Sequence, residues 1–152
     1  MNRISPKLLL LAIGVGVAVF LFSLVYYSKY PLGAKLQIRN HVFQVELAIK
    51  PEEQMKGLGQ RKSLPLDHGM LFIFDHKDTY SFWMKDMEFP LDMVWIDDKT
   101  IVDISKNVPI QTGYPLPTFS PQKPVDRVLE INAGLADKYG FQIGDTVTYL
   151  KR

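Results

Sequence analysis

The stretch GMLFIF at residues 69–74 decides the fold, because it is a short continuous apolar run with polar residues on both sides. A run of this length is typical of a buried strand, since a core helix is usually at least about 10 residues long. The polar residues 75–78 follow it and predict a turn. The centre of the domain is therefore expected to be a sheet.

The segments on both sides of this run also predict strands. Phe43, Val45, Leu47 and Ile49 alternate with polar residues, so they share one face of a strand. A turn at residues 40–41 would join that strand to an earlier one. Further strands are expected at 80–85, 92–97, 101–105, 127–131 and 146–150, with a hairpin turn at 97–100.

Two short helices complete the prediction. Pro51 suits a first helical position, and Gly57 or Gly59 would end that helix. Asn132 would cap a second helix at 133–139. Two helices are too few for alternating strand–helix crossovers, so we expect a mostly β domain of the α+β class. Its sheet would be small, curled and mainly antiparallel, or barrel-like.

Residues 107–125 carry five prolines and Gly113. Proline lacks an amide proton and has a fixed φ angle, so this density excludes a regular element. A long irregular loop in a small domain is usually functional or disordered. We therefore count this loop among the candidate binding regions.

The N-terminal region differs from the rest of the chain. Residues 8–27 read LLLLAIGVGVAVFLFSLVYY, which is 20 residues without a charge. A helix of about this length spans a hydrocarbon core of roughly 30 Å. We predict a cytoplasmic head at 1–7, a transmembrane signal-anchor helix at 8–28, a linker at 29–34 and an extracytoplasmic domain at 35–152.

The orientation and processing of this segment rest on its flanks. Basic residues on the two sides are nearly balanced, so the short head is the main reason to leave the N-terminus inside. The partner of residues 8–28 is then the lipid bilayer, and the protein is a single-pass membrane protein. A cleaved signal peptide is the main alternative, although its apolar region usually has only about 7–15 residues. A buried core helix is the other alternative.

Composition narrows the function classes. The chain has no cysteine, which excludes disulfides, thiolate catalysis and cysteine-based zinc sites. Fifteen of the 18 Lys and Arg and all 16 Asp and Glu follow residue 34, so the predicted domain has a net charge of about −1. A near-neutral domain does not favour nucleic acid as a partner. His41, His68 and His76 are too scattered for a metal site, and no phosphate loop or cofactor motif is present. We expect no metal and no cofactor.

Several short motifs, taken in order, carry a family resemblance. The most specific are Gly69-Met-Leu-Phe72, Phe82-Trp-Met-Lys85 and Pro90-Leu-Asp92. Together with Glu46-Leu-Ala48 and Leu129-Glu130, they are similar to the family called domain of unknown function 192. The resemblance covers residues 36 to 150. It implies a small β-rich domain that is often exported or tethered to a membrane, and it implies no settled activity.

Six residues are the candidate ligand-binding residues, while catalytic residues stay unknown. Four are charged residues that interrupt or border apolar blocks, where burial is costly without a partner. Two are aromatic residues that offer flat faces for stacking. The set is Arg61, Trp83, Lys85, Asp92, Tyr114 and Glu130.

Three functions fit these observations. The first is a membrane-anchored binding or interaction module for a polar ligand such as a glycan or peptide. The second is a hydrolase in which Asp92 and Glu130 form a carboxylate pair about 5 to 9.5 Å apart. The third is a structural accessory domain that holds an envelope protein, in which case the charged residues form an ion-pair network.

Overall fold

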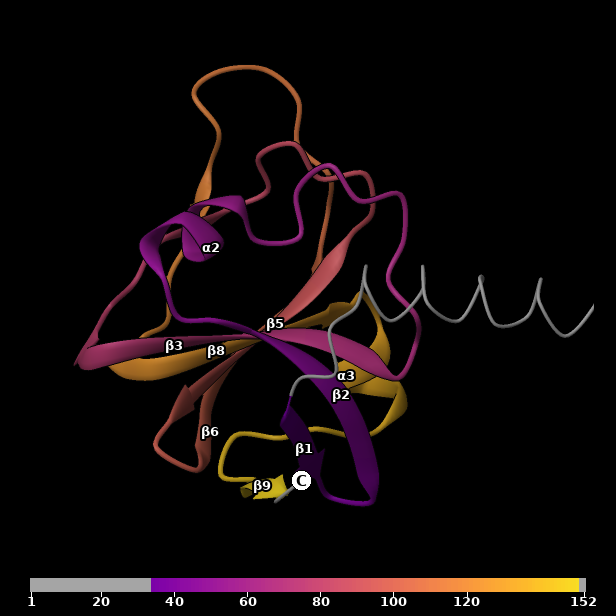
Figure 1. Ribbon diagram of the computed structural model, residues 1–152, viewed down its shortest axis with the longest axis vertical. Coiled ribbons are helices and arrows are strands. Elements are labelled where there is room, and N and C mark those ends of the chain that lie inside the picture. The colour runs from indigo at the N-terminus through magenta and orange to yellow at the C-terminus, as the bar shows by residue number, and fades with distance from the viewer. Residues whose placement is uncertain (1–33, 151–152) are drawn as a thin grey trace, which may run out of the picture. The chain divides into compact units, whose positions relative to one another are not determined.

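Seven strands of the computed structural model form one curled sheet in the order β6-β5-β8-β3-β2-β1-β9 (Figure 1). The structure describes residues 34–150, and the predicted anchor at 8–28 lies outside them. The strands are β1 (Ala34–Ile38), β2 (His41–Ala48), β3 (His68–Asp78), β5 (Leu91–Asp97), β6 (Thr100–Val108), β8 (Val125–Asn132) and β9 (Val147–Leu150). A two-stranded sheet pairs β4 (Phe82–Trp83) with β7 (Thr118–Phe119), and the helices are α2 (Pro51–Lys56) and α3 (Leu135–Lys138). Neither helix of the described region has the length and apolarity to cross a bilayer.

The predicted class is confirmed: the domain is mostly β, with two short helices and a curled, half-barrel sheet. All pairs in the large sheet are antiparallel except β2 and β3, which run parallel with α2 in the connection between them. The predicted turn at 75–78 is wrong, because β3 continues to Asp78 and pairs there with Val125 of β8.

The sheet curls far enough for its two edge strands to meet. Thr100 and Thr146 form an antiparallel bridge between the start of β6 and the residue before β9. Next to this bridge, the Ile101 amide donates to the Asp145 carbonyl at 3.0 Å, and the Val147 amide donates to the Lys99 carbonyl at 2.8 Å. These bonds satisfy backbone groups that an open edge would leave unpaired.

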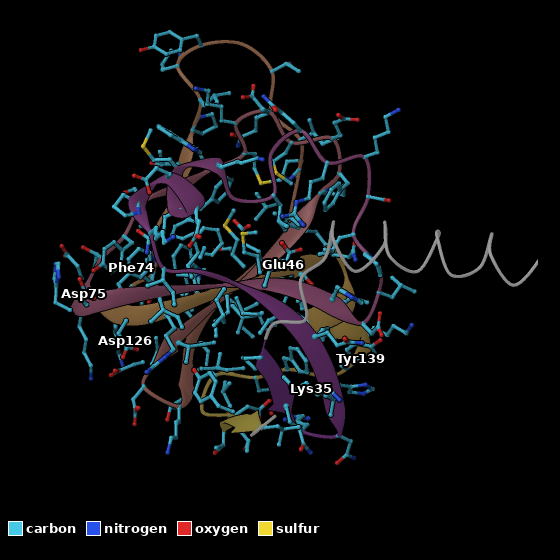
Figure 2. The ribbon with its side chains drawn as sticks, in the orientation of Figure 1. Lys35, Glu46, Phe74, Asp75, Asp126 and Tyr139 are labelled. Atoms are coloured by element: carbon cyan, nitrogen blue, oxygen red, sulfur yellow. The ribbon has the colours of Figure 1, made fainter. Side chains whose placement is uncertain are left out.

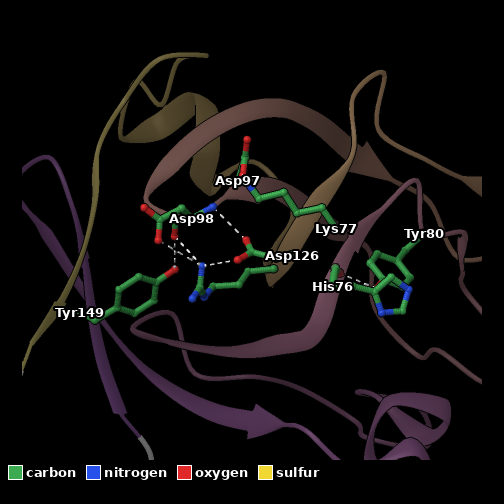
Figure 3. A network of polar contacts seen from close by, with 8 residues as sticks. His76, Lys77, Tyr80, Asp97, Asp98, Asp126 and Tyr149 are labelled. Carbon is green, nitrogen blue, oxygen red and sulfur yellow. Dashed lines mark hydrogen bonds and ion pairs between the residues drawn. The ribbon is translucent and has the colours of Figure 1, made fainter.

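A polar network stabilises this closure (Figure 3). The Arg127 guanidinium donates to the Asp98 carbonyl and to the Asp126 carboxylate, both at 2.8 Å. The Tyr149 hydroxyl donates to the same Asp98 carbonyl at 3.2 Å, and Arg127 lies 5.2 Å from the centre of its ring. Burial raises the pKa of Tyr149 to about 12, so this hydroxyl keeps its proton at neutral pH. The network thus joins β8, β9 and the β5–β6 turn.

Two separate hydrophobic cores cover the two faces of the sheet. Alternate residues of β5 show this, since Val94 and Ile96 belong to one core while Met93 and Trp95 belong to the other. The first core lies against β1, β9 and α3. The second lies under the loop after α2 and the segment around β4. The central strands are therefore buried on both sides, which explains their continuous apolar sequences.

The glycine of the GMLFIF run permits this packing. A Cβ atom on Gly69 would lie only 2.8 Å from the Glu130 carbonyl oxygen and 3.0 Å from Leu129. No side chain fits there without displacing β8. The position therefore requires glycine because of its close neighbours.

The segment at 80–85 differs from its prediction, since only Phe82 and Trp83 form a strand. The predicted alternation of sides nevertheless holds. Tyr80, Phe82 and Met84 pack into the second core, whereas Ser81, Trp83 and Lys85 are exposed. The segment at 107–125 is irregular apart from the end of β6 and the two residues of β7. It contains the orange loop at the top of Figure 1.

Asp92 holds α3 against the sheet. Its two carboxylate oxygens accept hydrogen bonds from the Asn107 amide at 2.7 Å and the Ala136 amide at 2.8 Å. The predicted helix start at Asn132 is wrong, because α3 begins at Leu135 after Gly134. The Asn132 side chain instead donates to the Leu64 carbonyl at 2.9 Å. Asp92 thus supplies the contact to a helix amide that Asn132 was expected to make.

We predict that Asp92→Asn lowers the free energy of unfolding by about 2 kcal/mol or more, since an amide nitrogen would face one of the two buried N–H donors. Chemical denaturation of the full chain, followed by fluorescence of the buried Trp95, measures this. Asp75→Asn on the exposed end of β3 is the control and should change the value by less than about 0.5 kcal/mol. Equal values for both variants would contradict a structural role for Asp92.

Candidate functional site

A cleft of about 270 Å³ opens between α2 with its following loop and the segment around β4. Its walls come from α2, residues 57–59, β3 and residues 80–87, and Glu130 of β8 also lines it. Figure 2 labels Phe74 and Glu46, which lie on this side of the sheet. The cleft therefore lies over the second core.

The sequence around α2 forms one wall. Pro51 occupies the first turn, and the Glu53 carboxylate accepts hydrogen bonds from the Ile49 and Lys50 amides. Gln54 donates to the Ile73 carbonyl at 2.9 Å, which fixes the helix to β3. Gly57 then ends the helix with a positive φ of 50°. Its backbone passes over the sheet, because a Cβ atom built there lies 3.4 Å from the Phe72 ring and 3.9 Å from Oε2 of Glu130.

Aromatic rings form the opposite wall. Phe74 stacks on Tyr80 with ring centres 3.6 Å apart. Phe82 meets Phe72 edge to face at 4.9 Å, and it meets Trp95 in the same way at 5.4 Å. At the rim, Trp83 is 49% exposed and Met55 is 74% exposed. Exposed apolar side chains beside a cleft offer a surface for a ligand.

Glu130 is the one buried carboxyl group among the lining residues. In the strand register it lies in a row across the sheet with Glu46, Met70 and Met93. It is only 4% exposed, and its Oε2 has no hydrogen-bond partner among residues 34–150. Burial raises its pKa to about 8, although the charge of Arg61 lowers it. At pH 7 the carboxyl is therefore mostly protonated.

Arg61 is bound by a different glutamate. Its two terminal nitrogens donate to the two carboxylate oxygens of Glu46, at 2.5 and 2.9 Å. The side chains are only 18% and 13% exposed, so water screens this ion pair little. Arg61 thus neutralises Glu46 next to Glu130.

The six predicted site residues do not all converge. Trp83, Lys85 and Glu130 line the cleft, and Arg61 acts electrostatically on Glu130. Tyr114 is 97% exposed in the proline-rich loop and does not line the cleft. Asp92 does not line it either, because its carboxylate binds backbone amides on the other face of the sheet. The predicted four-residue ion-pair network does not form within the described region.

The carboxylate pair required for hydrolysis is also not formed. Asp92 stands opposite Ile131, and Glu130 stands opposite Met93 in the same strand pair. Neighbouring positions of a strand point to opposite faces, so the two carboxyl groups lie on opposite sides of the sheet. The arrangement does not provide the carboxylate pair on which the alternative hydrolase hypothesis depends.

Sequence reasoning missed several residues of the cleft. Met55, Phe74 and Phe82 line it but had no distinguishing pattern beyond apolarity. Glu46, which binds Arg61 and does not line the cleft, was not singled out as a candidate either, because it alternates with apolar residues like any solvent-facing position. Within residues 34–150 no group of three potential metal ligands is present.

Comparisons with known proteins cover the same domain that the structure describes, residues 34–150. The profile of the DUF192 family, described as uncharacterized ACR, matches residues 34–149. A crystal structure from Sinorhizobium meliloti 1021, provisionally named a transcription regulator, is 35% identical with a TM-score of 0.70. That match covers 76% of this chain and 92% of the other. A protein of unknown function from Novosphingobium aromaticivorans DSM 12444 is 34% identical, with a TM-score of 0.69 and coverage of 75% and 83%. No curated protein matches the chain.

The raised pKa of Glu130 predicts a specific pH dependence of stability. The folded carboxyl holds its proton up to about pH 8, whereas an unfolded glutamate loses it near the ordinary value of 4.5. The stability from this group is therefore complete below pH 4.5 and falls as the pH rises to about 8.

Glu130→Gln removes this dependence, because the amide stays neutral at every pH. We expect its melting temperature, relative to the unmodified chain, to rise steadily from pH 5 to pH 8. The difference in the free energy of unfolding between the two chains should grow by at most about 1.4 kcal/mol per pH unit. Thermal unfolding of the full chain measures the effect, and Glu88→Gln at an exposed position is the control. A constant difference across this range would show that Glu130 titrates normally.

Proposed function

The chain belongs to the DUF192 family, and from this premise we propose that its β domain is a binding module for a polar ligand such as a peptide or a glycan. The observation that carries this proposal is the unpartnered Oε2 of Glu130 in the cleft. A buried polar atom without a hydrogen bond costs about 1–3 kcal/mol. A ligand that supplies the missing hydrogen bond recovers that cost.

The walls of the cleft support the same function. Their aromatic rings and the thioether of Met55 suit an apolar or ring-shaped part of a ligand. Polar side chains at the rim, including Gln54, Ser81 and Lys85, suit its polar parts. One buried polar group inside a mainly apolar cleft is the usual composition of a small-ligand site.

The proposal differs from the name of the Sinorhizobium protein. A regulator of transcription that binds DNA needs clustered basic residues to contact phosphates. Residues 35–152 carry a net charge of about −1, and within residues 34–150 the cations that line the cleft are Lys56 and Lys85. We therefore assign a peptide or glycan, and no nucleic acid, to this site.

We also propose that residues 8–28 hold the domain at a lipid bilayer, with residues from about 30 onward on the extracytoplasmic side. The uncharged run of 20 residues supports this, because its length matches the hydrocarbon core. The short head with Arg3 and Lys7 supports an N-terminus on the cytoplasmic side.

The cleft can be tested with a panel of short peptides and oligosaccharides added to the isotopically labelled full chain. We expect amide shifts to cluster at Gly57, Trp83 and Glu130. Trp83→Ala should weaken binding about fivefold, since stacking on a half-exposed ring contributes roughly 1 kcal/mol. Tyr114→Ala removes an exposed ring outside the cleft and should leave binding unchanged. No cleft shifts at millimolar concentrations, or equal losses in both variants, would refute the proposal.

The anchor can be tested by cell fractionation. We expect the full chain to stay with membranes in alkaline carbonate and to enter solution only with detergent. A chain starting at residue 34 should enter solution without detergent. A protease added outside intact spheroplasts should digest the domain of the full chain. Release of the full chain by carbonate alone would show that residues 8–28 do not span the bilayer.

A further inference from the structure

We propose that the group bound at the floor of the cleft is an alkylammonium ion, such as the side chain of a lysine residue or a free aliphatic amine. This inference rests on the proposed binding function and names the chemistry of its ligand. Glu130 would form the ion pair, and the aromatic rings would surround the methylene chain and the charge.

The first argument is the balance of charge around Glu130. Two carboxyl groups, Glu46 and Glu130, flank Met70 in the row across β2, β3 and β8. Arg61 is the cation that acts on Glu130, and both of its terminal nitrogens already bind Glu46. When Glu130 is ionised, this buried group has one negative charge in excess. A buried charge is stable only when it is paired, so the ligand that fits is a cation.

The second argument is the nature of the walls. Phe72, Tyr80, Phe82 and Trp83 line the same cleft as Glu130. The face of an aromatic ring attracts a cation by about 0.5–2 kcal/mol, and the attraction is largest away from water. Rings together with one carboxylate form the usual site for an organic ammonium ion, whereas a carboxylate ligand would gain nothing from the ring faces.

The lysines at the rim do not provide the missing cation. Lys56 and Lys85 line the cleft but are exposed, and neither forms an ion pair with another residue of the 34–150 domain. Their ammonium groups stay in water, where screening weakens repulsion of a second cation. A ligand amine that enters the cleft loses this water and gains Glu130 and the rings instead.

Binding of a cation also has a proton consequence. In the empty cleft Glu130 is mostly protonated at pH 7, since burial raises its pKa to about 8. An ammonium ion binds the ionised form, so each binding event releases a proton. The apparent affinity therefore rises by roughly tenfold per pH unit below pH 8. The other ionisable groups near this carboxyl are Arg61 with Glu46 beneath the cleft and Lys56, Lys85 and Tyr80 in its walls.

The test uses the full chain in lipid nanodiscs, with empty nanodiscs as the reference. Four probes are titrated: n-butylammonium, n-butanol, butyrate and lysine capped at both backbone ends. We expect n-butylammonium and capped lysine to shift the amides of Gly57 and Trp83. We expect at least tenfold weaker binding of n-butanol and no binding of butyrate. Titration calorimetry in two buffers should show proton release near pH 7 and about tenfold higher affinity at pH 7 than at pH 6.

Glu130→Gln keeps the shape of the side chain but removes its charge, so it should abolish both ammonium binding and proton release. Its melting temperature at pH 6 shows that the variant is folded. Glu88→Gln should bind both amines normally. Tighter binding of capped lysine than of n-butylammonium would identify a peptide as the source of the amine, and the reverse would identify a free amine.

The results separate this inference from the broader proposal. Tighter cleft binding of butyrate or n-butanol than of n-butylammonium would overturn the ammonium assignment but leave a binding module. Binding of n-butylammonium that Glu130→Gln does not weaken would also overturn it. If neither these probes nor the peptides and oligosaccharides bind, the binding function itself fails.

Discussion

Burial of the central sheet on both faces is the constraint on which the rest of the structure depends. Strands β5 and β8 have one core on each side, so a polar group at a covered position of these strands is costly unless its atoms are hydrogen-bonded. Asp92 and Glu130 are the two carboxyl groups that these strands place at fully covered positions.

The two carboxyl groups differ in whether their oxygens are hydrogen-bonded. Both carboxylate oxygens of Asp92 accept hydrogen bonds from backbone amides, and these bonds hold α3 and the end of β6 in place. Glu130 has an oxygen that no donor reaches within residues 34–150, and its burial raises its pKa to about 8. A fully bonded carboxylate is a structural element, whereas an unbonded one is a cost that a purely structural residue would not retain. The proposed binding function therefore rests on Glu130 rather than on Asp92.

The sequence predicted most of the fold because its signals were local. The apolar run at 69–74, the alternation at 43–49 and the turn chemistry at 97–100 each required a strand or hairpin, and each formed. The predictions that failed depended on contacts between residues that are far apart in the sequence. Asn132 suited a helix cap, but its side chain was needed at the Leu64 carbonyl, and Asp92 reached the helix amides from another strand. The parallel pairing of β2 and β3 likewise depended on how α2 crosses between them.

The predictions of the candidate site also succeeded where the signal was local and failed where it was not. Charged residues within apolar blocks were correctly singled out as unusual, but the one-dimensional pattern did not show which side of the sheet each would face. Asp92 and Glu130 lie on adjacent strands and differ by one position in register, which places them on opposite faces. Because of this difference of one position, Asp92 supports a helix, whereas Glu130 lines the cleft. Register, rather than residue type, thus determines which of these two carboxyl groups lines the cleft.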